Sequence, residues 1–373
     1  MKAWPILGIA FIQFFFLLDH WFLYNAWVAF CGHPAPLVDL ALTTVLTVLA
    51  CSFVVAAFLS FYSASPLVTA IYRLAAVWLG FLNYLFWAAC LAWLVWGALL
   101  LTRIDPTAAI HRPLIAWFLL DLALAVSLYG LLNARRVRIH RLAVHLANLP
   151  PTWRGRRALL ISDLHLGHIN GAAFSRRIAA KAARLDPDII FLPGDVFDGA
   201  KTNPDSLAAP LKLLSPPFGM YFSTGNHDEF GDTSHFVAAL THAGVRILNN
   251  EKVVVDGLQI LGVPYHDTTY PMRLRANLEA LRIDRTTASI LLNHVPNRLP
   301  IVEEAGVSLQ LSGHTHGGQL FPFTWLIRRV FGKFTHGLHS FGALQVYTSY
   351  GAGTWGPPMR VGTRPELVLL TFE

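Results

Sequence analysis

Residues 309–318 read LQLSGHTHGG, an apolar run followed at once by two histidines with glycines on both sides. The run Leu309–Leu311 is typical of a short buried strand. His314 and His316 stand one residue apart directly after it, and the small glycines leave room for ions to approach the backbone. A single histidine in this place is usually an ordinary surface or core residue. The pair suits two neighbouring metal ions, because imidazole is a common metal ligand.

The same pattern recurs four times earlier in the chain, where a predicted strand ends and a metal-capable residue follows. The strands are predicted at Ala158–Ser162, Asp188–Leu192, Met220–Ser223 and Ser289–Leu292. Amphipathic stretches between them are typical of helices, so the pattern predicts a layered α/β fold. In such folds ligands bind beyond the carboxyl ends of the strands. The candidate metal ligands are Asp163, His165, Asp195, Asn226, His294, His314 and His316.

The amino-terminal third has a different composition, being nearly all apolar up to about residue 132. A membrane-spanning helix needs about 20 apolar residues. Four segments reach that length: Trp4–Phe30, Leu37–Tyr62, Leu74–Leu101 and Pro113–Leu132. The first could instead be a cleaved signal peptide, but its apolar stretch is long and no small-x-small cleavage site stands out. All three cysteines, Cys31, Cys51 and Cys90, lie in this part, so the polar part has no disulfide or thiolate metal site.

The net charge of +7 is concentrated just after the apolar part. The basic residues there are Arg135, Arg136, Arg138, Arg141, Arg154, Arg156 and Arg157. With four spans, this cluster, Lys2 and Arg73 share one side of the membrane, and Arg103 and Arg112 face the other. The positive-inside rule then places both termini and the polar domain in the cytoplasm of a multi-pass protein of the cell (inner) membrane. A solvated basic linker is the simpler interpretation of the cluster, and neither interpretation predicts a nucleic-acid partner.

The composition therefore predicts three regions: a four-helix transmembrane domain at 1–132, a basic juxtamembrane linker at 133–156 and a globular domain at 157–373. Within the spans, Asp19, His20, Asn83 and Asp121 would either bind a lipid head or a proton, or pack helices through hydrogen bonds. Packing is the favoured interpretation.

A late apolar and basic loop would either meet lipid heads or form a lid. It contains Trp325, Leu326, Arg328, Arg329, Phe331 and Phe334.

The order of these motifs resembles the calcineurin-like metallophosphoesterase superfamily from about Arg157 to Glu373. The matching motifs are Asp163-Leu164-His165, Gly194-Asp195, Gly225-Asn226-His227, His294 and Gly313-His314-Thr315-His316. The tail from Gly353 to Arg360 resembles a branch of membrane-attached phosphoesterases. The resemblance implies a four-layer αββα sandwich, here preceded by four transmembrane helices. It also implies hydrolysis of phosphate mono- or diesters, with a lipid-linked ester among the substrates that fit and membrane lipids as partners.

The resemblance assigns two metal sites that share Asp195. Asp163, His165, Asp195 and His316 would hold the first ion, and Asp195, Asn226, His294 and His314 the second. Nitrogen and oxygen ligands suit Mn²⁺, Fe²⁺/Fe³⁺ or Zn²⁺. His227 would face the leaving group as general acid or electrostatic partner. Asp198 would orient its ring, with Asp228 as the weaker alternative for that orienting role.

Two departures from the family narrow the substrate. Gly199 stands where the Ser/Thr protein phosphatases of the superfamily have an arginine, which argues against a phosphoprotein substrate. His227 stands where the soluble lipid A pathway enzymes have an arginine, which argues against close identity with them. A membrane-anchored metal sensor without hydrolase activity is the main alternative, and a transporter with a hydrolase domain is a weaker one. The sequence predicts no oligomeric state.

Overall fold

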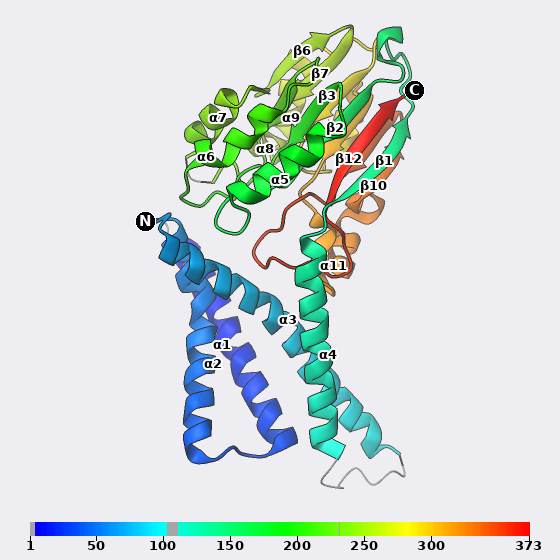
Figure 1. The fold of residues 1–373 in the computed structure, drawn as a ribbon. Helices are drawn as coiled ribbons and strands as arrows, with labels where there is room; N and C mark the ends of the chain where they lie inside the picture. Colours follow the sequence, from blue (N-terminus) through cyan, green and yellow to red (C-terminus); the bar gives the residue numbers. More distant parts are fainter. Residues whose placement is uncertain (1–3, 103–110, 231) are drawn as a thin grey trace. The chain divides into compact units, whose positions relative to one another are not determined.

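The computed structural model describes residues 4–102, 111–230 and 232–373 of the chain (Figure 1). Two compact units are present. One comprises residues 1–132 with Gly356–Met359, and the other comprises Asn133–Trp355 with Arg360–Glu373. Lys2 and Arg103, which enter the sequence-based topology, lie outside the described residues.

The helical unit contains four helices long and apolar enough to span a membrane. They are α1 (Trp4–Cys31), α2 (Pro36–Ser60), α3 (Pro66–Leu100) and α4 (His111–Ala134). α3 begins eight residues before the predicted Leu74, because Ser65 caps it by accepting a hydrogen bond from the Val68 N–H. Pro66 then fits the first turn, where a proline sacrifices no hydrogen bond.

Polar residues inside this unit support the packing interpretation at one place. Trp78 on α3 donates its indole N–H to His20 Nε2 on α1 over 3.0 Å, and the other ring nitrogen of His20 lies 2.7 Å from the Phe16 carbonyl. The imidazole thereby joins two helices. By contrast, Asp19 Oδ1 is buried and has no hydrogen-bond partner among the described residues.

The second unit is built on two mixed six-stranded sheets. The first has the order β1 (Arg138–Val144), β12 (Glu366–Phe372), β2 (Arg157–Leu160), β3 (Ile189–Pro193), β4 (Met220–Ser223), β5 (Val245–Ile247). The second has the order β10 (Gly337–Phe341), β11 (Leu344–Thr348), β9 (Leu309–Ser312), β8 (Ser289–Leu292), β7 (Leu258–Gly262), β6 (Glu251–Val255). Strands β2 to β5 pair in parallel, as do β7, β8 and β9.

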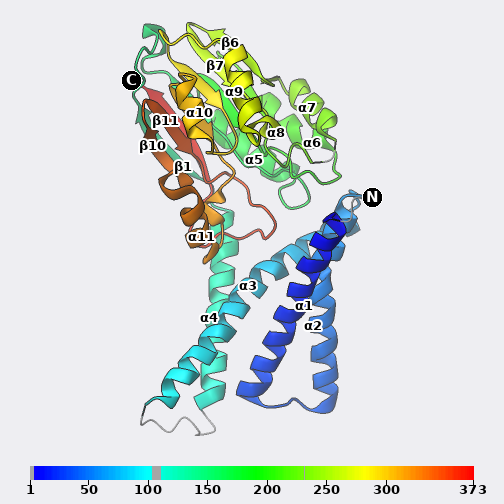
Figure 2. The same ribbon diagram turned by 180° about the vertical axis from the view of Figure 1, so that it is seen from behind.

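Helices cover the outer face of each sheet. The first sheet packs against α5 (Ala172–Ala183), α6 (Pro204–Ala208), α7 (Thr233–His242) and the 3-10 helix η2 (Ala209–Leu213). The second packs against α9 (Pro271–Ala280) and α10 (Leu299–Glu304), next to the short α8 (Tyr265–Thr268), as Figure 2 shows from the other side. The predicted αββα sandwich preceded by four apolar helices is therefore confirmed.

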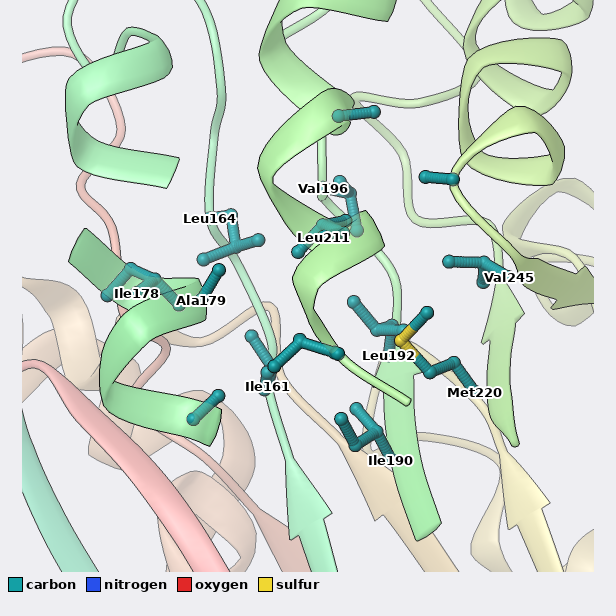
Figure 3. Packing of buried hydrophobic residues seen from close by; sticks show 14 of the residues in the cluster. Ile161, Leu164, Ile178, Ala179, Ile190, Leu192, Val196, Leu211, Met220 and Val245 are labelled. Carbon is teal, nitrogen blue, oxygen red and sulfur yellow. The ribbon is translucent and has the colours of Figure 1, made fainter. Parts of the chain in front are cut away.

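Side-chain alternation along β3 shows how the layers are held together. Ile190 and Leu192 point into the core beneath the helices of the first sheet (Figure 3), whereas Ile189 and Phe191 join the core between the two sheets. Successive residues of a strand face opposite sides. A strand buried on both faces therefore reads as the continuous apolar run seen in the sequence.

The segment expected as a linker differs from expectation, because it contains β1. This strand pairs in parallel with β12, and Leu142 lies opposite Leu370. Trp153, in the 3-10 helix η1 (Pro151–Trp153), is completely buried between the sheets. The strand was not predicted, because its exposed arginines, such as Arg138 and Arg141, are typical of a linker as well. An edge strand with one solvated face often carries charge. Only residues 135–137 separate α4 from β1.

Candidate metal centre

The predicted ligands lie just beyond strands of both sheets. Asp163 and His165 follow β2, Asp195 follows β3 and Asn226 follows β4 in the first sheet. His294 follows β8, and His314 and His316 follow β9, in the second sheet. The structure brings the Asp and His side chains into three overlapping groups whose ligand atoms lie within 4.8 Å of one another. These groups are Asp163/His165/His316, His165/Asp195/His227 and Asp195/His294/His314.

Asp195 occupies the shared position between the groups. Its Oδ2 lies 3.2 Å from His294 Nε2 and 3.6 Å from His165 Nε2. Its Oδ1 accepts a hydrogen bond of 2.9 Å from the His227 backbone N–H, which fixes the carboxylate plane. One oxygen is therefore held by the protein, and the other faces histidines on both sides. A carboxylate so placed has the geometry of a bridging ligand.

Asp228 supports the two loops that carry Asp195 and Asn226. Its carboxylate accepts backbone N–H groups of Asp195 (2.6 Å), Gly225 (2.9 Å) and Phe197 (2.9 Å). Burial and the nearby Asp195 raise the pKa of Asp228 to about 7. The carboxylate is thus a structural clamp between loops, and its partners do not include the His227 side chain.

In the first group, two histidines point ring nitrogens at each other. His165 Nε2 and His316 Nε2 are 3.0 Å apart, and His165 Nδ1 lies 3.1 Å from Asp198 Oδ1. A neutral His165 that donates from Nδ1 to this carboxylate presents a lone pair at Nε2. Asp163 Oδ1 lies 3.5 Å from His316 Nε2 and also accepts the His314 backbone N–H. Lone pairs of nitrogen and oxygen therefore converge at this place.

In the second group, His294 offers an orphaned buried nitrogen. Its Nδ1 lies 2.8 Å from the Pro193 carbonyl, which can only accept, so Nδ1 carries a proton. Its Nε2 is buried, lies 3.2 Å from Asp195 Oδ2 and makes no hydrogen bond of ordinary geometry with a described residue. Burial opposes a charge on His294, but the Asp195 carboxylate raises the pKa of this imidazole to about 9. The surroundings thus favour a cation between Asp195 and His294.

His314 and Asn226 complete the second group. The His314 Nδ1 atom lies 3.0 Å from Asn226 Oδ1. Burial, reinforced by the charge on His294, lowers the pKa of His314 to about 3, so this ring stays neutral. The two groups together offer only nitrogen and oxygen ligands around a shared carboxylate. The residues present therefore fit a pair of divalent metal ions.

The backbone at these positions is unusual. Asp163, His165, Asp195, His314 and His316 all have positive φ between 45° and 68°. Asp and His adopt this left-handed region more readily than most residues, but it remains uncommon outside glycine. Such conformations cluster at functional sites, where the surrounding structure holds them in place. Tight turns after the strands thus aim these side chains inward.

The position of Asp198 differs from the expected role. Its carboxylate lies closer to His165 Nδ1 (3.1 Å) than to His227 Nδ1 (3.6 Å). His227 Nδ1 instead lies 3.3 Å from the backbone carbonyl of Asp198. The carboxylate therefore orients a candidate metal ligand, and the main chain of the same residue orients His227. The resemblance implied Asp198 as the partner of His227, but it could not say which atom of Asp198 meets which ring.

Arg360 is a residue of the site that sequence reasoning did not assign. Its fully buried guanidinium donates to the carbonyls of Tyr350 (2.7 Å) and Gly353 (2.7 Å), and Nη2 lies 3.0 Å from His316 Nδ1. A guanidinium only donates, so a neutral His316 keeps its own proton on Nε2. A metal ligand at Nε2 needs the lone pair there, so this proton would have to leave Nε2 before His316 could bind an ion. The only sequence signal was the position of Arg360 in the family-like tail.

The four-layer sandwich with buried His and Asp groups is consistent with a dimetal protein of the layered α/β class. Comparison with known proteins then specifies the family. The model of the calcineurin-like phosphoesterase family matches residues 156–318. A metallophosphoesterase of Aquifex aeolicus is 32% identical over 264 residues, which cover 68% of this chain and 98% of that protein. The chain belongs to the calcineurin-like metallophosphoesterase family.

Two further similarities extend the comparison. A "transmembrane protein with metallophosphoesterase domain" of Danio rerio is 31% identical over 267 residues, or 66% of this chain. The chain matches 60% of that relative's length. A dimetal phosphatase from Danio rerio, known as a crystal structure, is 12% identical, with a TM-score of 0.35 over 53% of this chain and 88% of that one.

Proposed function

We propose that the protein is a membrane-anchored hydrolase of phosphate mono- or diesters that uses two divalent metal ions. Asp163, His165, Asp195 and His316 would hold one ion, and Asp195, Asn226, His294 and His314 the other. The single observation that carries this proposal is Asp195 Oδ2, which faces His294 Nε2 at 3.2 Å and His165 Nε2 at 3.6 Å. Two metals in such a site lower the pKa of a bound water and polarise the phosphoryl group.

The residues of this chain would then have separate tasks. Asp195 joins the two halves of the site, and its carboxylate would offset part of the positive charge of the two metal ions. Asp198 keeps His165 in the tautomer whose Nε2 is free to bind. The Asp198 carbonyl, 3.3 Å from His227 Nδ1, fixes the proton of a neutral His227 on Nδ1, so His227 must take up a second proton on Nε2 before it can protonate the leaving oxygen. Nitrogen and oxygen ligands suit Mn²⁺, Fe or Zn²⁺.

The test is hydrolysis by the purified full chain in detergent. With Mn²⁺ added, we expect release of nitrophenol from an aryl phosphate or a bis-aryl phosphate. The control is the double variant Asp195→Ala/His316→Ala, which should retain no metal-dependent activity. Equal rates for the two proteins would refute the proposal. Metal bound in the wild type without any hydrolysis, over a broad panel of phosphate esters, would favour the sensor alternative.

We further propose that the metal-binding domain is cytoplasmic and that both termini share that side. The asymmetry of lysine and arginine around the four candidate spans supports this topology. In this arrangement residues 1–132 anchor the domain, residues 135–137 join α4 to β1, and residues 157–373 hold the site. A reporter fused after Glu373 tests the orientation. Reporter activity found only outside the cytoplasm would overturn it.

A further inference from the structure

The helix α11 (Phe323–Phe331) has an apolar face that the described residues leave largely uncovered. Phe323, Leu326, Ile327, Val330 and Phe331 recur at the spacing of one helix face. In a globular domain such a face normally packs on the core. Here none of the nine residues of α11 is buried, and Phe323, Leu326 and Val330 are 49%, 50% and 65% exposed.

Basic and aromatic side chains border this face. Arg328 and Arg329 lie on the other side of the helix, and the Arg329 guanidinium stands 4.8 Å over the Trp325 ring. Phe321, before the helix, is also exposed. More than half of the exposed large apolar side chains described in this unit lie between Phe321 and Val330 or at Trp355. We call α11 together with Phe321 and Trp355 the docking surface.

The docking surface reaches the candidate metal centre from two directions. Phe331, at the end of α11, places its ring 6.2 Å from that of His314. Trp355 places its ring 5.9 Å from that of His227. The side-chain amide of Gln319 exchanges two hydrogen bonds, of 2.9 and 3.0 Å, with the backbone of Trp355, and this ties Trp355 to the segment that leads into α11. Apolar rings thus border the metal centre beside both histidines.

From these observations we propose that the docking surface lies in the headgroup region of the bilayer. It would present to the metal centre phosphate esters whose apolar part stays in the membrane. An apolar helix face flanked by arginine and tryptophan is the composition of interfacial helices, and its cations match anionic lipid heads. The choice of substrate class rests on the proposed function; the membrane contact does not.

A bilayer is the occupant that the chain itself brings. The four candidate spans place one next to the domain in every molecule. Only three residues separate Ala134, which ends α4, from Arg138, which begins β1. A linker of that length reaches about 14 Å even when fully extended. A domain tethered so closely stays beside a bilayer, so lipid is available to its exposed apolar face in every molecule.

The membrane contact can be tested without catalysis, by fluorescence quenching in the full chain. Cys31, Cys51 and Cys90 are replaced by alanine, and a fluorophore is attached to Val330→Cys. Its matched control is Val254→Cys on β6, since Val254 is 61% exposed and Val330 65%. The protein is reconstituted in nanodiscs of phosphatidylcholine and phosphatidylglycerol that contain nitroxide-labelled lipid. The apolar face of an interfacial helix lies roughly 5–10 Å deep in the boundary between headgroups and acyl chains, so we expect quenching at residue 330 to be stronger by roughly threefold or more.

Equal quenching at both positions, or no quenching at position 330, would overturn the membrane contact. Either result is also what a protein partner or a second copy covering α11 would give. Adding Arg328→Glu and Arg329→Glu should weaken the quenching at position 330 most in anionic discs. The metal-site variant Asp195→Ala should be quenched like the wild type, so a failure of hydrolysis and a failure of docking give different results.

The substrate class has its own measurement. We compare kcat/KM for a long-chain phosphate ester embedded in vesicles with that for a soluble short-chain analogue. Confinement to the membrane raises the effective concentration of substrate, so we expect the embedded ester to be favoured by about tenfold or more. Val330→Glu should remove this preference, and Val254→Glu should keep it. Equal values for the two esters in the wild type would overturn the assignment.

Discussion

Gly225 provides the sharpest test of the candidate metal centre, because a single added methyl group would strike the shared carboxylate. A Cβ atom at this position would lie 2.2 Å from Asp195 Oδ1 and 2.5 Å from the Asp195 backbone nitrogen. Gly225 is not among the residues with positive φ, so alanine can adopt its backbone conformation. The effect of Gly225→Ala is therefore steric and local.

The structure sets the size of the effect. Ordinary van der Waals contacts of a Cβ begin at 3.4 Å, so Asp195 Oδ1 must retreat by more than 1 Å. That movement breaks the bond of 2.9 Å from the His227 N–H and shifts Oδ2 relative to His294. A displacement of about 1 Å typically costs about 10²-fold in rate. Overpacking should cost a further 1–3 kcal/mol of stability, approximately.

The assay measures three quantities on the same detergent-purified protein: bound metal by elemental analysis, hydrolysis of an aryl phosphate, and the midpoint of thermal unfolding. We expect Gly225→Ala to lose metal and about 99% of its activity while most of the protein stays folded at 25 °C. Gly97→Ala is the control, since a Cβ there meets nothing within 4 Å. If Gly225→Ala keeps its full metal content and activity within threefold of the wild type, Asp195 is not the shared ligand.

Three further outcomes follow from the same geometry. Asp195→Ala should lose both metal ions, whereas His294→Ala should lose only one, as elemental analysis of the purified variants would show. His227→Gln should keep its metals but lower kcat by about 10²–10⁴-fold for alkyl phosphates, and much less for nitrophenyl phosphate, whose leaving oxygen needs no proton. Glu366 is buried, which disfavours its charge, but the hydrogen bond with His336 still holds its pKa below the ordinary 4.5. The charged Glu366 therefore stabilises the folded state above pH 4.5, and this contribution is lost as the pH falls through the folded-state pKa. Metal-free Glu366→Gln should be less stable than the wild type at pH 7. Its free energy of unfolding should also fall less on acidification, as thermal unfolding at several pH values would show.

The layered fold and the place of the centre could be predicted because local patterns determine them. A strand such as β3, buried on both faces, needs apolar residues at every position, so it stands out in the sequence. Chance alone would rarely place a metal-capable residue directly after each of five such strands. Spans of 24 to 35 residues with hardly any charge can also be predicted from the sequence, since the hydrocarbon core of a membrane sets their minimum length.

Long-range pairing could not be predicted in this way. β1 pairs with β12, whose first residue lies more than 200 positions further along the chain. The arginines in β1 interrupt the apolar pattern that would otherwise predict a strand there. The loop expected around Trp325 is the helix α11, whose nine residues are too few for a propensity argument to separate helix from loop. Whether its apolar face is covered depends on the tertiary structure and not on the pattern.

Arg360 shows why a set of ligands does not amount to a site. It cannot bind a cation, so no argument from metal chemistry would select it. Yet its buried guanidinium joins the carbonyls of Tyr350 and Gly353 to the His316 ring, which lies 44 residues earlier in the chain. A buried charge is tolerated only when several acceptors surround it, so this network forms only when the loop and the ring are in place together. Short motifs predict which residues are the candidate metal ligands. The arrangement of those ligands depends on residues, such as Arg360, whose role appears only after the chain has folded.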